Sequence, residues 1–186
     1  MEPIEINAGT WYLRALRADE RVDDRPTLLT GATDPDTMRY APHMAVKSNA
    51  AATEHVRRRA RQWSDDARYS WAVCNPTTGE MLAEVGLCNI EHTERTAEIM
   101  CWTAPTHRNK GIMATAAAAV VRLALAPEVM GGLGLHRVSY LHVDGNTAAA
   151  ALAQRCGMVA EGRLREAALI DGARRDMMLL ARLATD

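Results

Sequence analysis

The segment that decides the fold reads Arg108-Asn109-Lys110-Gly111-Ile112-Met113-Ala114-Thr115. It joins a predicted strand to a predicted alanine-rich helix, and a helix start exposes unpaired backbone N–H groups at the positive end of the helix dipole. Such groups bind a phosphate or pyrophosphate. Gly111 would let the backbone approach that ligand closely. Arg108 and Lys110 add positive charge, and Thr115 adds a hydroxyl, so the segment predicts an anion at a helix N-terminus.

The residues alone leave the identity of this anion open. The P-loop pattern G-x-x-x-x-G-K-[ST] is absent from the chain, and the glycine spacing does not match a dinucleotide fingerprint. An ordinary solvated loop between a strand and a helix fits the same residues equally well.

Outward from this segment, the chain predicts a meander of strands followed by crossover helices. Asn75-Pro76-Thr77-Thr78-Gly79 is a strong turn within the meander, and Asp171-Gly172 is a turn near the end of the chain. This order predicts a mixed sheet in an α/β or α+β domain. The expected strands cover residues 10–17, 69–74, 81–90, 96–103, 136–143, 159–170 and 174–183, and the expected longer helices cover residues 49–66, 112–126 and 146–156.

The helix predicted over residues 49–66 carries a cluster of arginines. Val56, Ala60 and Trp63 fall at helical spacing and are expected to form its buried stripe. A solvated helix face explains the arginines better than a phosphate site does; they are Arg57, Arg58, Arg59 and Arg61.

Length and composition limit the class of protein. A chain of 186 residues fits one domain, residues 1–186. The net charge of -1 gives no overall basic excess for a nucleic-acid partner. No apolar run is long enough for a transmembrane helix, and the acidic N-terminus lacks a signal-peptide core, so we expect a cytoplasmic protein without a membrane partner. The four cysteines form no C-x-x-C pair, so no metal is expected.

The ordered set of motifs resembles the GNAT acetyltransferase superfamily and, within it, the RimJ/RimL-like branch. Residues 108–113 resemble the [RQ]-x-x-G-x-[GA] coenzyme A motif, and residues 97–105 resemble the strand that precedes it. Residues 135–138 resemble the start of the next strand, and residues 146–158 are similar to the N-x-x-S and R-x-G-F helix. Residues 13–17 and 34–38 also fit that branch, so the resemblance spans nearly the whole chain in order.

The resemblance implies a GNAT-like α/β (α+β) fold: a mixed, splayed, mostly antiparallel sheet flanked by helices, with acetyl-CoA held in the splay. Asn146 would bind the cofactor arm near the thioester. The pantetheine would pair with the backbone of Met100, Cys101, Trp102 and Thr103. The pyrophosphate would bind Arg108, Asn109, Lys110, Gly111, Ile112, Met113 and Ala114, with the hydroxyl of Thr115 beside them.

Two residues depart from the pattern of the family. Met113 stands where Gly or Ala is usual, which narrows the space at the pyrophosphate. Ala149 stands where the branch often has Ser, a hydroxyl sometimes assigned to protonate the departing thiolate. Ala cannot donate a proton, and Cys156, Tyr140 or water could serve instead, so the general acid stays open.

Three side chains are candidates for a general base, which is needed only if the amine arrives protonated. They are Glu98, Glu84 and His142, on the strand before the motif and its neighbours. Each also fits an ordinary position, on the solvated sheet for the carboxylates and at the surface for the histidine. By resemblance, Arg39 and Tyr40 border the acceptor site as candidate substrate contacts.

The resemblance implies an N-acetyltransferase that moves an acetyl group from acetyl-CoA to a primary amine by direct attack on the thioester. The RimJ/RimL-like branch favours an N-terminal α-amine of a protein or peptide. A small-molecule amine such as an antibiotic, an amino acid or a polyamine is the alternative acceptor. A non-catalytic acyl-CoA-binding domain is the alternative of another class, and a homodimer is expected only by analogy with the branch.

Overall fold

The computed structural model describes the backbone of residues 1–186 and every side chain except that of His43. Over these residues the chain forms one eight-stranded sheet in the order β1-β2-β3-β4-β5-β6-β8-β7. The strands are β1 (Ile6–Ala8), β2 (Trp11–Arg14), β3 (Tyr69–Cys74), β4 (Met81–Glu91), β5 (Thr96–Thr103), β6 (Arg137–Val143), β7 (Val159–Ile170) and β8 (Ala173–Leu183). The helices are α1 (Arg25–Thr30), α2 (Pro35–Tyr40), α3 (Asn49–Ser64), α4 (Ile112–Leu125) and α5 (Thr147–Arg155). Short 3₁₀ turns lie at Gly31–Thr33, Pro42–Met44, Pro105–His107 and Glu128–Met130.

The sheet is splayed between β5 and β6, the pair that runs parallel. Only Thr96, Ala97 and Glu98 of β5 are in register with β6, so the two strands separate beyond that point. The other neighbouring strands pair antiparallel. The mixed, splayed and mostly antiparallel sheet expected from the resemblance is therefore confirmed.

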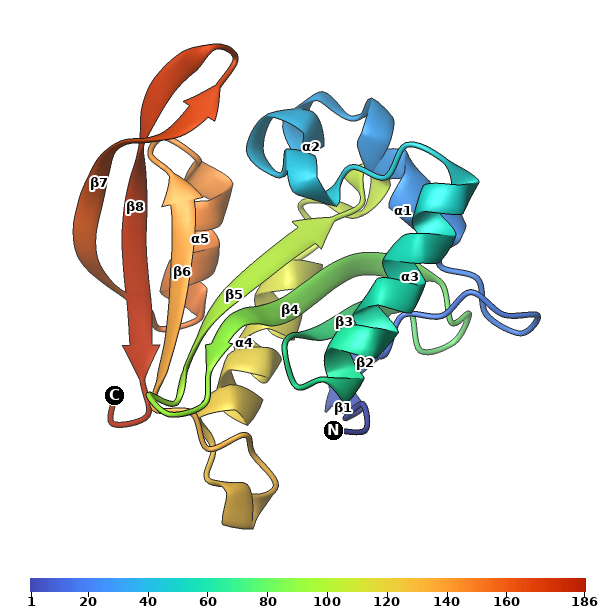
Figure 1. Ribbon diagram of the computed structural model, residues 1–186, viewed down its shortest axis with the longest axis horizontal. Coiled ribbons are helices and arrows are strands. Elements are labelled where there is room, and N and C mark those ends of the chain that lie inside the picture. Colours follow the sequence, from blue (N-terminus) through green and yellow to red (C-terminus); the bar gives the residue numbers. More distant parts are fainter.

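Helices cover both faces of the sheet, with α3 in front of the sheet and α4 behind it in Figure 1. On the α4 face, Ala116 and Val120 are buried against strand residues such as Val85. On the opposite face, Leu28 of α1 and Val56 of α3 belong to a second core. The small residues of α4 let that helix lie close to the sheet. This close packing fixes the position of the loop that precedes α4.

The buried side of α3 differs from the predicted stripe. Val56 and Trp63 are buried as expected, but Ala60 is exposed and Arg59 is buried. The predictions for Ala60 and Arg59 were wrong because a buried carboxylate on β4, Glu84, accepts a hydrogen bond from Arg59. A tertiary partner therefore draws a charged residue into the core, which helical periodicity cannot indicate.

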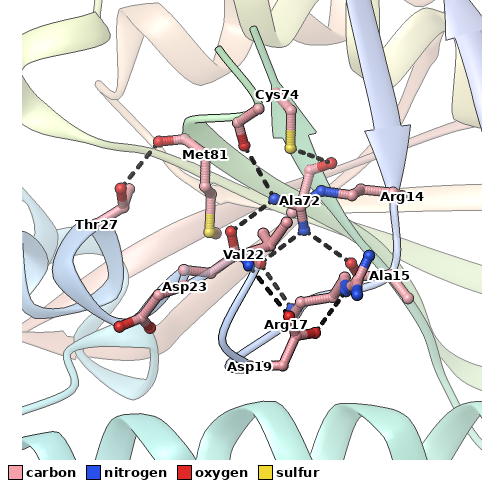
Figure 2. Close-up of polar contacts among 12 residues, drawn as sticks. Arg14, Ala15, Arg17, Asp19, Val22, Asp23, Thr27, Ala72, Cys74 and Met81 are labelled. Carbon is pink, nitrogen blue, oxygen red and sulfur yellow. Dashed lines mark hydrogen bonds and ion pairs between the residues drawn. The ribbon is translucent and has the colours of Figure 1, made fainter. Parts of the chain in front are cut away.

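The strand predicted over residues 10–17 ends at Arg14 because the chain turns there around a buried ion pair. Both terminal nitrogens of Arg14 donate to Asp24, each at 2.8 Å, and Asp24 precedes α1. Figure 2 shows the loop from Arg17 to Asp23 folded back beside Arg14, and the Thr27 hydroxyl donating to the carbonyl oxygen of Met81 at 2.9 Å. The Arg14–Asp24 pair thus links the start of α1 to β2, and the Thr27–Met81 bond holds α1 against β4.

Candidate active site

An open cleft of about 610 Å³ lies where β5 and β6 separate. Its walls come from α2, the end of β5, the loop before α4, the middle of β6 and the start of α5. The lining residues are Asp36, Thr37, Tyr40, Ala41, Cys101, Trp102, Thr103, residues 107–114, Tyr140, residues 145–149, Ala151, Leu152 and Arg155. Segments far apart in the sequence thus meet around one opening.

The loop before α4 presents free backbone donors to this cleft. Asn109 (φ 60°) and Gly111 (φ 73°) both adopt left-handed backbone conformations, and Gly111 is the residue that precedes the helix. The N–H groups of Ile112, Met113 and Ala114 donate to no acceptor among the described residues. These unpaired donors and the positive end of the helix dipole are the features that bind an anion at a helix N-terminus, the role that the sequence predicts for this segment.

The polar side chains of this loop are engaged elsewhere. Lys110 Nζ donates to the carbonyl oxygen of Thr106 at 2.9 Å. The Thr115 hydroxyl donates to the carbonyl oxygen of Gly111 at 3.3 Å, and Thr115 is not among the lining residues. The guanidinium of Arg108 forms ion pairs with α2. Binding of an anion by the loop therefore depends mainly on its backbone.

The end of β5 forms a second wall of the cleft. Cys101, Trp102 and Thr103 line it, whereas the side chain of Met100 packs on the second core at the opposite face. Beyond Glu98 the β5 edge has no partner strand on the β6 side. Its backbone groups are thus open to an extended ligand in the splay.

Tyr140 and Cys101 face each other across the splay, with the phenol oxygen 3.9 Å from the Cys101 sulfur. Burial raises the pKa of Tyr140, and the neighbouring Cys101 raises it further. Burial also raises the pKa of the Cys101 thiol to about 12. Both groups are therefore protonated at neutral pH, and Tyr140 presents a phenol O–H in the cleft.

The start of α5 closes the cleft on the third side. The Asn146 side chain lines the cleft, and its Oδ1 accepts a hydrogen bond from the Ala149 N–H at 3.1 Å. Ala149 also lines the cleft. The cleft is also lined by Arg155, at the end of α5, and by His107, neither of which the sequence predicts as a site residue. Arg155 lies in the R-x-G part of the quoted motif, which was the available signal.

None of the three candidate bases lies among the residues that line the cleft. Glu84 is buried, and its carboxylate oxygens each lie 2.9 Å from a partner, His55 Nε2 and Arg59 Nε. Glu98 accepts a hydrogen bond from Asn89 at 3.1 Å, near the point where β5 and β6 still pair. His142 is buried on β6, with Nδ1 2.9 Å from the carbonyl oxygen of Val143.

Burial acts to raise the pKa of Glu84, but the hydrogen bond and charge of His55 and the charges of Arg59 and Arg68 outweigh it. The pKa of Glu84 is thereby lowered to about 2. A carboxylate with so low a pKa is a weak proton acceptor, so the surroundings of Glu84 suit an ionic link between α3 and β4.

The two candidate substrate contacts, Arg39 and Tyr40, differ in their position relative to the cleft. Tyr40 lines the cleft, but Arg39 does not. The Arg39 guanidinium lies 5.6 Å above the Tyr40 ring and forms an ion pair with Asp171 at 2.7 Å. Asp171 lies in the turn between β7 and β8, which reaches toward α2 in Figure 1. Arg39 thus joins the two segments at the mouth of the splay.

The described residues contain neither a candidate metal centre nor a candidate membrane span. No group of three or more His, Cys, Asp and Glu side chains has an arrangement that could hold a metal ion. Within the same residues, no helix has the length and apolar character needed to cross a bilayer.

The chain belongs to the acetyltransferase (GNAT) domain family, whose sequence model matches residues 12–159. The matched region contains every residue that lines the cleft, from Asp36 to Arg155. This match confirms the resemblance to the GNAT superfamily. It also confirms the enzyme class expected from the sequence, with acetyl-CoA as the expected co-substrate of that family.

Individual relatives agree with this class. The chain is 28% identical over 100 residues to "Putative ribosomal N-acetyltransferase YdaF" of Bacillus subtilis (strain 168), which is 54% of this chain and 52% of that protein. The chain thus matches about half the length of this curated relative.

Two solved structures share the fold. RimL, a ribosomal L7/L12 alpha-N-protein acetyltransferase in complex with coenzyme A, has a TM-score of 0.81 at 22% identity, over 97% of this chain and 98% of that chain. Spermidine N-acetyltransferase from Vibrio cholerae, in complex with CoA and spermine, has a TM-score of 0.78 at 23% identity, over 95% and 96% of the two chains.

Proposed function

We propose that this chain is an acetyl-CoA-dependent N-acetyltransferase and that its acceptor is the N-terminal α-amine of a protein or peptide. The proposal is carried by the free N–H groups of residues 112–114, which open into the splay in a chain of the GNAT family. The α-amine is supported by the curated relative, which is named as a ribosomal N-acetyltransferase.

The cofactor would follow the walls of the cleft. Its pyrophosphate would bind the amides of residues 108–114, with the charges of Lys110 and Arg155 nearby. Its pantetheine would run along the free backbone edge of residues 100–103. Asn146 would contact the arm near the thioester. Met113 lines the cleft and would narrow the space beside the pyrophosphate compared with Gly or Ala.

The reaction needs a neutral amine close to the thioester carbonyl, and positioning supplies much of the rate. The nitrogen attacks the carbonyl carbon and the C–S bond breaks. The nitrogen then loses a proton and the sulfur gains one. The Tyr140 phenol, which lines the cleft, is the proton donor for the sulfur in this proposal, and it takes its proton back from the water that receives the amine proton. Water in the open cleft accepts the proton from the amine.

Two alternatives have support of their own. A small-molecule amine is favoured by the fold shared with the spermidine N-acetyltransferase. Binding of acyl-CoA without turnover is favoured by Ala149, which supplies no hydroxyl at the start of α5. One experiment distinguishes the three functions: acetylation of an α-amine, acetylation of a small-molecule amine, and binding of acyl-CoA without turnover.

The experiment is a calorimetric titration with acetyl-CoA, followed by an assay of CoA release. Wild-type protein is compared with Gly111→Trp, which places a large side chain at the anion site. The acceptors are a peptide with a free N-terminal serine, the same peptide acetylated at its N-terminus, and spermidine. We expect the wild-type protein to bind acetyl-CoA and the Gly111→Trp variant to lose this binding. Of the three acceptors, only the peptide with the free N-terminus should cause CoA release. Turnover of spermidine alone would identify a polyamine as the acceptor. Binding of acetyl-CoA without turnover of any acceptor would identify a non-catalytic acyl-CoA-binding domain. No binding of acetyl-CoA would refute the proposed function.

We also propose a cellular compartment and an oligomeric state for this protein. The four cysteines are free, which fits a reducing compartment, and we place the protein in the cytoplasm. A homodimer follows only by analogy with the RimJ/RimL-like branch, and light scattering of the purified protein tests it.

A further inference from the structure

The hydroxyl of Thr37 on α2 uses its full hydrogen-bonding capacity. It accepts from Trp102 Nε1 at 2.8 Å and from Arg108 Nη2 at 3.0 Å, and it donates to Asp34 Oδ2 at 2.7 Å. A hydroxyl has one donor and two acceptor sites, so none is left over. Thr37 is 2% exposed, and this buried oxygen thus joins α2, β5 and the loop before α4 at one point.

The guanidinium of Arg108 is held by α2 on a second side. Asp34, the residue that caps α2, accepts from both terminal nitrogens of Arg108 and also from the Thr37 N–H. Asp36 accepts from Nη1 at 3.2 Å. Burial acts to raise the pKa of Asp34, but the hydrogen bonds from Arg108 and Thr37 outweigh it and lower the pKa. The carboxylate therefore stays ionised against the guanidinium at neutral pH.

This arrangement leaves Arg108 poorly suited to bind phosphate through its side chain. One guanidinium already faces two carboxylates, and bidentate pairs of this kind are strong and directional. Phosphate binding would require the guanidinium to leave Asp34 and the buried Thr37 oxygen. The backbone of the same loop, by contrast, offers free N–H groups to the cleft.

α2 depends on these bonds for its position. It has six residues, of which only Thr37 is buried, and helices this short are not stable alone in water. It nevertheless forms one wall of the cleft through Asp36, Thr37 and Tyr40. The wall on the acceptor side is therefore held by contacts to β5 and to the loop before α4.

We propose that Arg108 is a positioning residue that couples the cofactor loop to α2, so that cofactor bound on the loop backbone orders the acceptor wall. This inference rests on the proposed function, because it takes acetyl-CoA as the ligand of the loop. By linkage, a ligand that favours the ordered loop also favours the ordered α2.

Hydrogen exchange measured by mass spectrometry tests the coupling without knowledge of the acceptor. Saturating acetyl-CoA should slow exchange of the α2 amides, residues 35–40, about fivefold or more in the wild-type protein. Thr37→Val and Arg108→Met should both lose this slowing. They should still bind acetyl-CoA within about threefold of the wild-type Kd, because the ordered form of α2 already dominates in the protein without cofactor. Unchanged exchange in β3 serves as the control for folding.

Lys110→Met is the matched comparison, since it removes one charge from the same loop without touching α2. It should weaken acetyl-CoA binding while the bound protein keeps the slowing of α2. The opposite result is that Arg108→Met raises the acetyl-CoA Kd tenfold or more while exchange in α2 is still slowed at saturation. That result would show that the Arg108 side chain contacts the phosphate of the cofactor, and it would overturn the inference. Wild-type protein that binds acetyl-CoA without slowing α2 would overturn it and leave the proposed function intact. No binding at all would refute both.

Discussion

Replacing Glu84 by glutamine should destabilise the protein strongly and spare the chemistry. Glu84 is 1% exposed, and it joins β4 to α3 through His55 Nε2 and Arg59 Nε, each at 2.9 Å. The substitution keeps the shape of the side chain but removes the negative charge. Arg59, itself 5% exposed, then remains in the core without a counter-charge.

The lowered pKa of Glu84 gives the magnitude. A fall from 4.5 to about 2 corresponds to about 3 kcal/mol of preference for the ionised form in the folded protein. Removing one partner of a buried ion pair typically costs about 3–5 kcal/mol, and the value obtained from the pKa lies at the lower end of this range. Because the folded-state pKa is depressed, this stabilisation is present above pH 4.5 and disappears as the pH falls toward 2.

Urea unfolding at pH 7 measures the effect. Glu84→Gln should lower the free energy of unfolding by about 3 kcal/mol, and the melting temperature by roughly 6–12 °C for a chain of this size. Glu98→Gln is the control, because Glu98 is only partly buried and accepts one side-chain hydrogen bond, so its loss should change stability by about 0.5 kcal/mol or less. A Glu84→Gln protein that is fully stable but releases no CoA would refute this reasoning and identify Glu84 as a general base.

The remaining predictions concern the cleft. Gly111→Ala forces a Cβ into a left-handed conformation (φ 73°) at a cost of about 1–2 kcal/mol, so calorimetry should find the acetyl-CoA Kd raised about tenfold; an unchanged Kd would contradict this. Tyr140→Phe should lower kcat about 100-fold in the CoA-release assay with little change in acetyl-CoA affinity, and an unchanged kcat would exclude the phenol as the acid. Ala149→Ser restores a hydroxyl in the cleft and should recover part of the kcat lost in Tyr140→Phe; no recovery would argue against an acid at that position.

Most of the fold could be predicted because its signals are local. The turn at residues 75–79 and the apolar, strand-like runs on either side of it specify the meander without reference to the rest of the chain. The free amides before α4 follow from the way a helix begins, and Gly111 marks that point in the sequence. The resemblance to the GNAT family then supplied the splay, which no local pattern contains.

The candidate site was predicted less completely because its polar side chains are placed by distant partners. Arg108 reads as a phosphate contact beside Gly111, yet its carboxylate partner Asp34 lies 74 residues earlier. The sequence leaves Glu84 as either a candidate general base or a solvent-facing strand residue, whereas the fold buries it against His55 and Arg59 of α3. In each case a tertiary ion pair decides where the charge lies, and neither periodicity nor motif spacing carries that information.

The cleft itself follows from unequal strand pairing on the two edges of β6. Seven residues of β6, from Arg137 to Val143, are in register with β8, whereas three are in register with β5. The backbone bonds to β8 therefore hold the whole length of β6 with β7 and β8, and β5 stays with β4. The edges that separate expose backbone groups on β5 opposite the phenol of Tyr140, and α4 starts at the same end of the splay. An extended ligand that enters this opening thus meets free backbone groups of β5, the unpaired amides before α4 and the phenol O–H of Tyr140, and the same division of the sheet fixes all three.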